Sequence, residues 1–283
     1  MKRIALRLIP AVVLAAAAGA PALAEEVAET PDPNVLRVCA STRDAPYSER
    51  NGQGFENKIA AVLAEEAGLK LDLVMIDNDA IYLVRDGVDK GLCDALIGVD
   101  SEDPRLLTST PYYKSGYAFI SREDRGFDGE KWQDVDREGY ETFALRYHTP
   151  AETILKYTGR YEYNLIYHSS LSNFEDRRNK YTQIPASLVV SEVAQGNADL
   201  GIIFAPEGAR YVRDSRTPLK LTLISNDLER SDGLIIPLRY EQSVGVSRAR
   251  PELLPKIEAA LVSGKARIEA ILQEEGVPTL PLS

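Results

Sequence analysis

The feature that most restricts the fold of this sequence is an alternation of short apolar runs with amphipathic stretches. The first half shows five such elements in strict order. They are a strand at 35–39, a helix from Phe55 to Gly68, a strand at 71–76, a helix at 80–90 ended by Gly91, and a strand at 94–99. A strand–helix–strand–helix–strand order implies a parallel sheet with helices on its faces.

The same order recurs in the second half, so each unit is too small to be the whole protein. Its predicted elements are a strand at 142–146, a helix from Thr149, a strand at 163–167, a helix from Ser187 closed by Gly196, and a strand at 199–204. Thr149, Pro150 and Glu152 suit the N-cap, first and third positions of a helix and predict a capping box.

Connecting segments predict how the two units are joined. A strand at 117–121 leaves the first unit, and two extended runs within 234–246 return to it before a helical stretch at 251–276, with breaks expected near Pro255 and Gly264. We therefore expect an α/β fold of two lobes, each a mixed sheet flanked by helices, joined by two crossing strands. The expected lobe 1 is 25–120 with 238–283, and lobe 2 is 121–237. In open α/β sheets ligands bind at the carboxyl ends of strands, which predicts a cleft between the lobes.

The first 24 residues have the character of a signal peptide. Lys2, Arg3 and Arg7 precede a short apolar run, and residues 22–24 form an Ala-Leu-Ala cleavage signal. Cleavage after Ala24 would give an exported protein, most simply in a bacterial periplasm. The remaining net charge would be −13, from 30 basic and 43 acidic residues. Such an acidic chain repels phosphate backbones, which argues against nucleic acid as a partner.

Export decides how the two cysteines are interpreted. Cys39 and Cys93 are the only pair, and an oxidising compartment favours a disulfide between them over two buried thiols that never meet. Two Cys and two His without ligand-like spacing argue against a zinc site. No loop carries the spaced carboxylates of a dedicated calcium or lanthanide site, so we expect no metal and no cofactor.

Several segments resemble the family 3 extracellular solute-binding proteins. They are 36–40, 45–48, 54–58, 97–100, 103–105 and 110–113. The resemblance covers most of residues 35–276 and implies a periplasmic-binding-protein-like (type II) fold with two lobes.

A narrower resemblance is to the MoxJ group, also called MxaJ or XoxJ. It is carried by Gly54–Ile59, Ile81–Asp86, Cys93-Asp94, Ile97–Asp100, Tyr181–Ile184, Val190–Ala194, Arg210–Ser215, Arg230–Gly233, Gln242–Val246 and Ile268–Leu272. The group accompanies methanol dehydrogenases that use pyrroloquinoline quinone with calcium or a lanthanide. The resemblance implies a partner protein that binds or helps to mature the dehydrogenase, with the quinone and metal held by that partner.

The broad family also suggests where a ligand would bind. Its amino-acid receptors hold the ligand carboxylate with an Arg, whose position here is Arg105, unless Arg105 is a surface residue at a helix start. The acid that takes the amino group should fall at Phe204 or Ala205, and neither can pair with an ammonium. Gly98 and Asp100 stand where serines are usual, and Asp100 is placed to neutralise Arg105. These departures disfavour an amino-acid receptor.

Tyrosines in lobe 2 offer a second surface. Half of the 14 Tyr lie between Tyr140 and Tyr181, and Tyr is enriched in protein interfaces. We assign Tyr163 to the core and leave Tyr147, Tyr157, Tyr161 and Tyr167 open between core packing and an interface or cleft rim. His148 is the more cleft-like histidine. The candidate cleft residues are Tyr47, Phe55, Glu56, Asp100, Arg105, Tyr147, His148, Thr149 and Phe204.

Three functions remain open from the sequence. The first is a non-catalytic partner of a methanol dehydrogenase, which presents its cleft to a protein segment. The second is a receptor for a small metabolite or cofactor, of the kind that serves an ABC transporter, with Arg105, Tyr47 and Phe55 in its pocket. The third is an enzyme on the same fold, for which only Glu56, Asp100 and His148 are candidate acids or bases, and no catalytic motif supports them.

Overall fold

The computed structural model describes residues 32–172 and 183–283. Residues 33–283 form one unit of closely connected elements. The expected signal peptide at 1–24 and the segment up to residue 31 lie outside the described residues, and so do residues 173–182, which include Tyr181. Among the helices that the structure does describe, none is both long and apolar enough to cross a bilayer.

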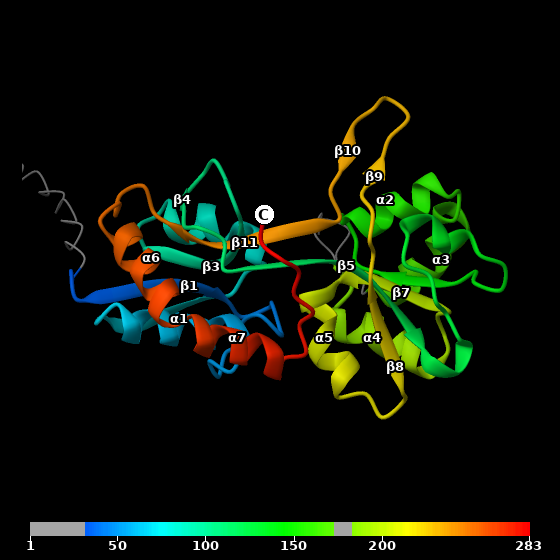
Figure 1. The fold of residues 1–283 in the computed structure, drawn as a ribbon, viewed down its shortest axis with the longest axis horizontal. Coiled ribbons are helices and arrows are strands. Elements are labelled where there is room, and N and C mark those ends of the chain that lie inside the picture. Colours follow the sequence, from blue (N-terminus) through cyan, green and yellow to red (C-terminus); the bar gives the residue numbers. More distant parts are fainter. Residues whose placement is uncertain (1–31, 173–182) are drawn as a thin grey trace, which may run out of the picture. The chain divides into compact units, whose positions relative to one another are not determined.

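The first half of the chain forms the parallel sheet that its apolar runs predict (Figure 1). Strand β1 lies between β2 and β3 and is parallel to both. Helix α1 packs on β2 and β3, with the apolar positions Phe55, Ile59 and Leu63 fully buried, because their spacing places them on one helix face. The elements are β1 (Val35–Ser41), α1 (Phe55–Glu66), β2 (Lys70–Ile76) and β3 (Ala95–Asp100).

The helix expected at 80–90 forms as two irregular helical turns. A 3₁₀ turn, η1 (Ala80–Tyr82), is followed by a π-helical turn, η2 (Val84–Val88). Gly87 lies in the second turn against the sulfur of Cys39, where a Cβ would overlap that atom. The backbone therefore packs directly against β1 at this point, as a regular helix with larger side chains would not.

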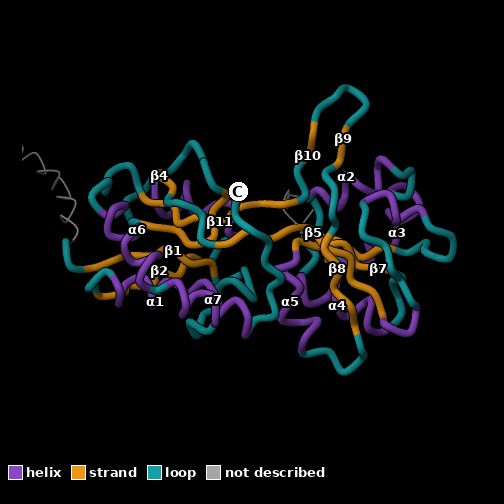
Figure 2. The backbone as a smooth tube through the Cα atoms, viewed as in Figure 1, coloured by secondary structure: helices purple, strands orange, loops and turns teal. Residues whose placement is uncertain are grey.

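Two long strands, β5 (Tyr113–Arg122) and β11 (Arg239–Val246), connect the lobes. Residues 113–116 of β5 pair with β11, whereas residues 117–120 pair with β7, so β5 changes partners within its length. The main sheet has the order β2-β1-β3-β11-β5-β7-β6, with β4 (Leu107–Thr108) on β11 and β8 (Leu219–Leu223) on β5 (Figure 2). The crossing strands predicted from the sequence are thus present.

The second lobe is built on β6, β7 and β8 beside β5. Strands β6 and β7 are parallel, while β5 is antiparallel to both β7 and β8. A two-stranded hairpin of β9 and β10 stands apart from the main sheet (Figure 1). The elements are η3 (Glu123–Arg125), η4 (Trp132–Asp136), β6 (Phe143–Leu145), α2 (Pro150–Tyr157), α3 (Tyr161–Leu171), α4 (Ala186–Gln195), β7 (Leu200–Phe204), α5 (Ala205–Arg213), β9 (Leu228–Glu229) and β10 (Ile235–Ile236).

The strand predicted at 163–167 is wrong, because these residues lie inside helix α3. The alternation of Tyr163, Leu165 and Tyr167 imitates a strand, but the buried positions are Asn164 and His168, four residues apart as on a helix face. Tyr163, which was assigned to the core, has 86% of its surface exposed. Helix α4 and its end at Gly196, which has φ 78°, are confirmed.

The C-terminal segment forms α6 (Leu253–Ser263) and α7 (Lys265–Glu274), so the break expected at Gly264 is confirmed. The break expected near Pro255 is wrong. Pro255 is the third residue of α6, where a backbone N–H has no intrahelical partner, so its missing donor costs nothing.

Buried apolar residues form separate clusters on both faces of the sheet in each lobe. In the first lobe the larger cluster lies under α1, α6 and α7, and the smaller one surrounds the two cysteines. In the second lobe one cluster lies under α2 and the other under α4. The lobe boundaries expected from the sequence, at residues 120 and 237, stay a prediction.

Candidate functional site

A cavity of about 1140 Å³ lies where the carboxyl ends of β1 and β3 face those of β6 and β7. The first lobe contributes the loop after β1, the start of α1 and the end of β3. The second lobe contributes the segment after β6 and the start of α5. Strand ends expose backbone groups and short loops, so this is the edge where α/β folds bind ligands.

The structure brings most of the predicted cleft residues into this cavity. Those that line it are Tyr47, Glu56, Asp100, Tyr147, His148, Thr149 and Phe204. Phe55 and Arg105 do not line it. Phe55 is fully buried at the first position of α1, and its ring centroid lies 4.9 Å from that of Tyr47. Phe55 therefore supports the ring of Tyr47 from the core.

Arg105 belongs to the surface beside the cavity. Its guanidinium forms a bidentate pair with Asp103, with Nη2 2.6 Å from Oδ2, and 58% of the side chain is exposed. Asp100, which the sequence suggested as its partner, instead accepts a hydrogen bond of 2.9 Å from Nε2 of Gln242. The turn at Pro104 places Asp103 within reach of Arg105, so Arg105 does not anchor a ligand carboxylate in this cavity.

Three carboxylates, Asp44, Glu56 and Glu207, give the cavity its electrostatic character. Burial raises the pKa of Asp44, and the neighbouring Arg146 only partly opposes this. Burial raises the pKa of Glu56 well above its usual value, and the negative charge of Asp44 adds to the effect. Burial likewise raises the pKa of Glu207. Desolvation thus disfavours the charged form of all three groups.

Arg146 is the cation that faces these carboxylates. It follows β6 directly, and its Nη1 donates a 2.5 Å hydrogen bond to Oε1 of Glu207. Its Nε is buried and has no hydrogen-bond partner among the described residues. Its pKa is raised although burial lowers it, because Glu207 and Asp44 stabilise the charge. Arg146 and Glu207 therefore form a largely buried ion pair on one wall of the cavity.

Gly98 fixes the position of the Glu56 carboxylate. Gly98 has φ 69°, a left-handed conformation that favours glycine, and a Cβ there would overlap Oε1 of Glu56. The carboxylate thus lies directly over the backbone of β3. The unusual glycine noted in the sequence provides the space that a side chain would fill.

The capping box predicted at 149–152 does not form, and the expectation is wrong. Oγ1 of Thr149 donates to the carbonyl of Arg146 at 2.8 Å instead of accepting from the helix. Oε2 of Glu152 accepts from the backbone N–H of His148, one residue earlier than a capping box requires. His148 has φ 58°, which turns the chain early and gives its N–H to Glu152.

The two histidines differ as the sequence suggested. His148 is exposed and lines the cavity. His168 is fully buried in α3, where its Nε2 lies 2.7 Å from the carbonyl oxygen of Phe143, and burial lowers its pKa.

The tyrosines that the sequence left unassigned lie in three places: the core, the cavity and the surface. Tyr147 lines the cavity, whereas Tyr161 and Tyr167 pack partly against the buried clusters. The hydroxyl of Tyr167 donates to Oε2 of Glu192 at 2.9 Å. Tyr157 is exposed at the end of α2.

The disulfide between Cys39 and Cys93 is present, which confirms that prediction. It ties β1 to the residue that precedes Asp94 and β3, with the two Cα atoms 5.4 Å apart. Both cysteines are buried, and Gly87 of η2 packs against the bridge. The bond thus fixes the strands whose ends form one wall of the cavity.

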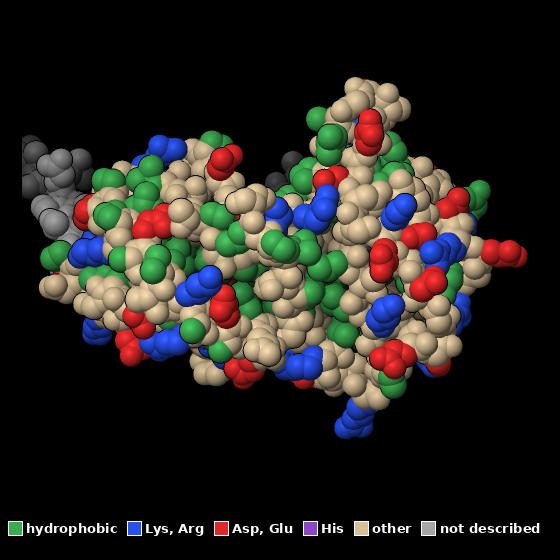
Figure 3. Space-filling model, in the orientation of Figure 1, with side chains coloured by type: hydrophobic (Ala, Val, Ile, Leu, Met, Phe, Trp, Pro, Cys, Tyr) green, Lys and Arg blue, Asp and Glu red, His purple; other side chains and the backbone are tan. Residues whose placement is uncertain are grey.

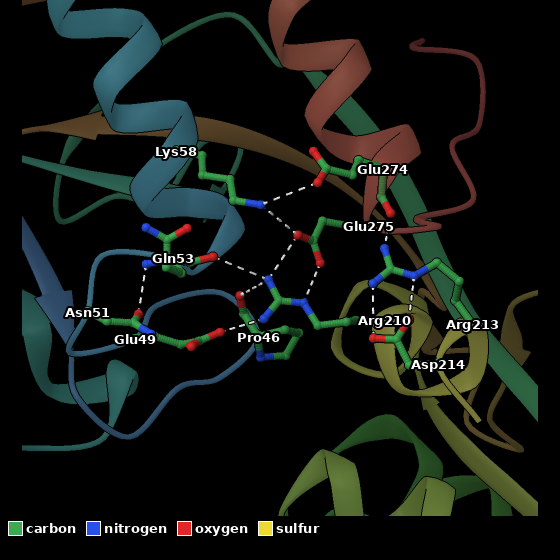
Figure 4. A network of polar contacts seen from close by, with 10 residues as sticks. All are labelled: Pro46, Glu49, Asn51, Gln53, Lys58, Arg210, Arg213, Asp214, Glu274 and Glu275. Carbon is green, nitrogen blue, oxygen red and sulfur yellow. Dashed lines mark hydrogen bonds and ion pairs between the residues drawn. The ribbon is translucent and has the colours of Figure 1, made fainter. Parts of the chain in front are cut away.

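A polar network beside the cavity joins the two lobes (Figure 4). Arg210 of α5 reaches across to Glu275, with Nε 2.5 Å from Oε2, and also pairs with Glu49. Glu275 follows α7 and is nearly fully buried, and it receives a second cation from Lys58 of α1 at 3.3 Å. The pKa of Glu275 is lowered because hydrogen bonds from Arg210 and Lys58 outweigh its burial. The network links α5 of the second lobe to three segments of the first.

Sequence reasoning missed Asp44, Arg146, Glu207 and Arg210. The first three each follow a strand by no more than three residues: Asp44 after β1, Arg146 after β6 and Glu207 after β7. A search for charged residues at strand carboxyl ends would have found them. Arg210 has no such signal, because it lies inside a helix and meets Glu275 only through the fold.

Nothing in the described part of the chain is arranged to hold a metal ion, since it contains no suitable group of three or more His, Cys, Asp or Glu residues.

Comparison with known proteins identifies the family. A protein named MoxJ from Paracoccus denitrificans is 69% identical over 266 residues, which is 94% of this chain and 96% of the relative. A MoxJ from Methylorubrum extorquens is 45% identical over 98% of this chain and 94% of the relative. A scan of protein-family models found no match.

Solved structures agree with these relatives. The crystal structure of MxaJ from Methlophaga aminisulfidivorans is 41% identical and superposes with a TM-score of 0.81, covering 87% of this chain and all of that one. The periplasmic binding protein XoxJ from Methylobacterium extorquens is 25% identical with a TM-score of 0.64, again over 87% of this chain and all of that one. An ancestral cationic amino acid solute-binding protein, 18% identical with a TM-score of 0.62 over 86% of this chain and 96% of that one, shares the fold. The chain has a periplasmic-binding-protein-like fold and belongs to the MoxJ family.

Proposed function

We propose that this protein is a non-catalytic periplasmic accessory protein of methanol oxidation, which binds a quinone-dependent methanol dehydrogenase and assists or matures it. The observation that carries this proposal is membership of the MoxJ family over nearly the whole chain. Export would follow from the N-terminal segment, with cleavage after Ala24. N-terminal sequencing of the protein recovered from the periplasm tests that step.

The position of Arg105 supports a role other than amino-acid capture. Its guanidinium is committed to Asp103 outside the cavity. Of the two arginines that line the cavity, Arg146 is paired with Glu207 and Arg43 with Asp77. A ligand carboxylate would have to displace one of these partners, so the structure disfavours the anchor that amino-acid receptors use.

The second lobe carries exposed apolar side chains that suit a protein partner. Leu234 and Ile235 lie exposed on the β9–β10 hairpin, and Figure 3 shows hydrophobic side chains towards the base of this projection. Tyr163 and Ile166 are exposed on α3. Exposed apolar groups of this kind are typical of protein interaction sites, and an isolated two-stranded hairpin gains stability when a partner covers it.

Binding to purified methanol dehydrogenase, measured by surface plasmon resonance with the apo and holo enzymes, tests the proposal. We expect the variant with Leu234→Ser and Ile235→Ser to bind more weakly, because it removes apolar area from the contact. The control is Val262→Ser, since Val262 is an apolar residue on α6 of the other lobe that is even more exposed. Absence of binding by the wild-type protein to either form of the enzyme would count against the proposed function.

A further inference from the structure

We propose that the cavity between the lobes binds a cationic organic group, a primary ammonium or a guanidinium, which the carboxylates of Asp44 and Glu56 hold beside the ring and hydroxyl of Tyr47. This inference concerns the ligand of the cavity and goes beyond the proposed interaction with a dehydrogenase. It rests on the charge, the hydrogen bonding and the burial of the residues that line the cavity.

The charged residues that line the cavity are mainly acidic. They are Arg43, Asp44, Glu56, Asp79, Asp100, Arg146 and Glu207. Both cations already have partners, since Arg43 pairs with Asp77 and Arg146 with Glu207. The excess of negative charge over positive charge therefore favours a cation as the ligand.

Asp44 and Glu56 are two of the three lining carboxylates, with Asp79, that make no side-chain hydrogen bond or ion pair among the described residues. Within residues 32–172 and 183–283, neither side chain makes a hydrogen bond or an ion pair. Each carries a pKa raised by burial, which means that its charged form is poorly solvated in the cavity. A cation between them would supply the partner that a buried carboxylate requires.

Tyr47 provides an independent observation at the same place. Only 9% of its surface is exposed, it lines the cavity, and its hydroxyl has no hydrogen-bond partner among the described residues. Burial raises its pKa, and the charges of Glu207, Glu56 and Asp44 add to the effect, which places the hydroxyl among these carboxylates. A buried Tyr ring with a free hydroxyl offers an ammonium both a cation–π contact and a hydrogen-bond acceptor.

The arrangement differs from that of a zwitterion site. A ligand carboxylate would meet Arg146, whose Nη1 is held by Glu207, and would lie close to the charge of Asp44. The Nε of Arg146 is buried, so a ligand carboxylate would have to approach the Nη atoms, one of which is already bound to Glu207. The geometry therefore favours ligands that carry positive charge without a carboxylate.

Isothermal titration calorimetry with three four-carbon probes tests this inference: 1,4-diaminobutane, 1,4-butanediol and succinate. We expect only the diamine to bind, with an affinity that falls as salt is added. Binding of succinate or the diol as tightly as the diamine, or no binding of the diamine, would overturn the inference.

Variants locate the site. Glu56→Gln and Asp44→Asn each remove one charge with almost no change in volume, and we expect each to weaken diamine binding about tenfold or more. The control is Asp128→Asn, which removes a carboxylate from the surface outside the cavity. An equal loss in the control and in Glu56→Gln would show that the effect is one of net charge and would contradict the site.

The source of the cation is decided by two peptides, one with two Lys residues in an Ala background and one with Gln in place of each Lys. Tighter binding of the Lys peptide than of the diamine assigns the cation to a protein segment, whereas the reverse order assigns it to a free amine. Both results support a cation site. A protein that binds the dehydrogenase but none of the cationic probes would refute this inference and leave the proposed function intact.

Discussion

Gly98 shows how one residue without a side chain determines the position of a cavity carboxylate. It has φ 69°, and a Cβ there would overlap Oε1 of Glu56. We expect Gly98→Ala to lower the free energy of unfolding by about 3 kcal/mol, since both backbone strain and the overlap contribute.

The matched control is Gly68→Ala, because Gly68 has φ 67° and open space around it. We expect that change to cost about 1 kcal/mol from strain alone. Equal losses, measured by urea unfolding, would show that Glu56 moves away freely.

The raised pKa of Glu56 predicts how this residue affects stability as a function of pH. Its pKa is higher in the folded than in the unfolded protein, so stability is greatest below the usual value of 4.5 and is lost as pH rises towards the raised value. We therefore expect Glu56→Gln, which cannot ionise, to be more stable than the wild type at pH 7 and equal to it near pH 4. The measurement is urea unfolding at both values.

Asp103 provides a control of opposite sign for the pH experiment. The hydrogen bond from Arg105 lowers the pKa of Asp103, so its contribution to stability is present at neutral pH and is lost as pH falls through the lowered value. Asp103→Asn should therefore be less stable than the wild type at pH 7. A Glu56→Gln variant that also loses stability at pH 7 would contradict the assignment of a poorly solvated carboxylate.

At the residue scale the sequence predicted the cavity only in part. Tyr47 and Glu56 were among the candidate cleft residues, and both line the cavity. Arg105 was assigned by analogy with receptors, and its partner turned out to be Asp103, two residues away. Arg146 and Glu207 are 61 positions apart in the chain and meet only through the parallel pairing of β6 and β7. No local pattern reports such a contact.

At the scale of elements, the disulfide is the connection with the clearest energetic consequence. Cys39 lies in β1, and Cys93 stands 54 positions later at the start of the β3 segment. A loop of that length predicts that the bond stabilises the fold by about 4 kcal/mol through the entropy of the unfolded chain. We expect reduction with dithiothreitol to lower the unfolding midpoint of the wild type accordingly.

The double variant Cys39→Ala with Cys93→Ala provides the control for the reduction experiment. It should unfold at the lower midpoint with or without the reductant, since it has no bond to reduce. A wild-type midpoint that does not change on verified reduction would mean that the closed loop adds little to stability.

An element was predictable where its hydrophobic period and the residue that ends it gave the same answer. Helix α4 has an apolar face and ends at Gly196, and both signals were in the sequence. Helix α3 lacks such agreement, because its aromatic residues alternate with polar ones and its buried face consists of Asn164 and His168. A helix that buries polar side chains gives no hydrophobic period to detect. Its identity depends on the hydrogen bonds that those side chains make to the backbone around β6, such as Asn164 to Phe143.

At the scale of the whole molecule, the connection between the lobes depends on more than the crossing strands. Arg210 extends from α5 to Glu275 and Glu49 of the first lobe, and its side chain is mostly buried (Figure 4). In a trap that opens and closes, such contacts would have to break in each cycle. An ion pair this well shielded from water is costly to open, because each partner would be left uncompensated. We infer that the network restrains the lobes whether or not the cavity is occupied.

Removal of Arg210 tests this restraint. We expect Arg210→Ala to cost about 2–4 kcal/mol of stability, because it leaves the buried carboxylate of Glu275 with Lys58 as its remaining partner. We also expect faster amide exchange in residues 46–53 and a larger radius of gyration in solution scattering. The control is Arg122→Ala at the end of β5, since Arg122 is more exposed and its ion pair is with Asp124, two residues away in the same lobe. That change should cost less than about 1 kcal/mol and leave the radius of gyration unaltered. If Arg210→Ala lowers stability but neither exchange nor scattering changes, the network stabilises α5 locally and the crossing strands alone hold the lobes.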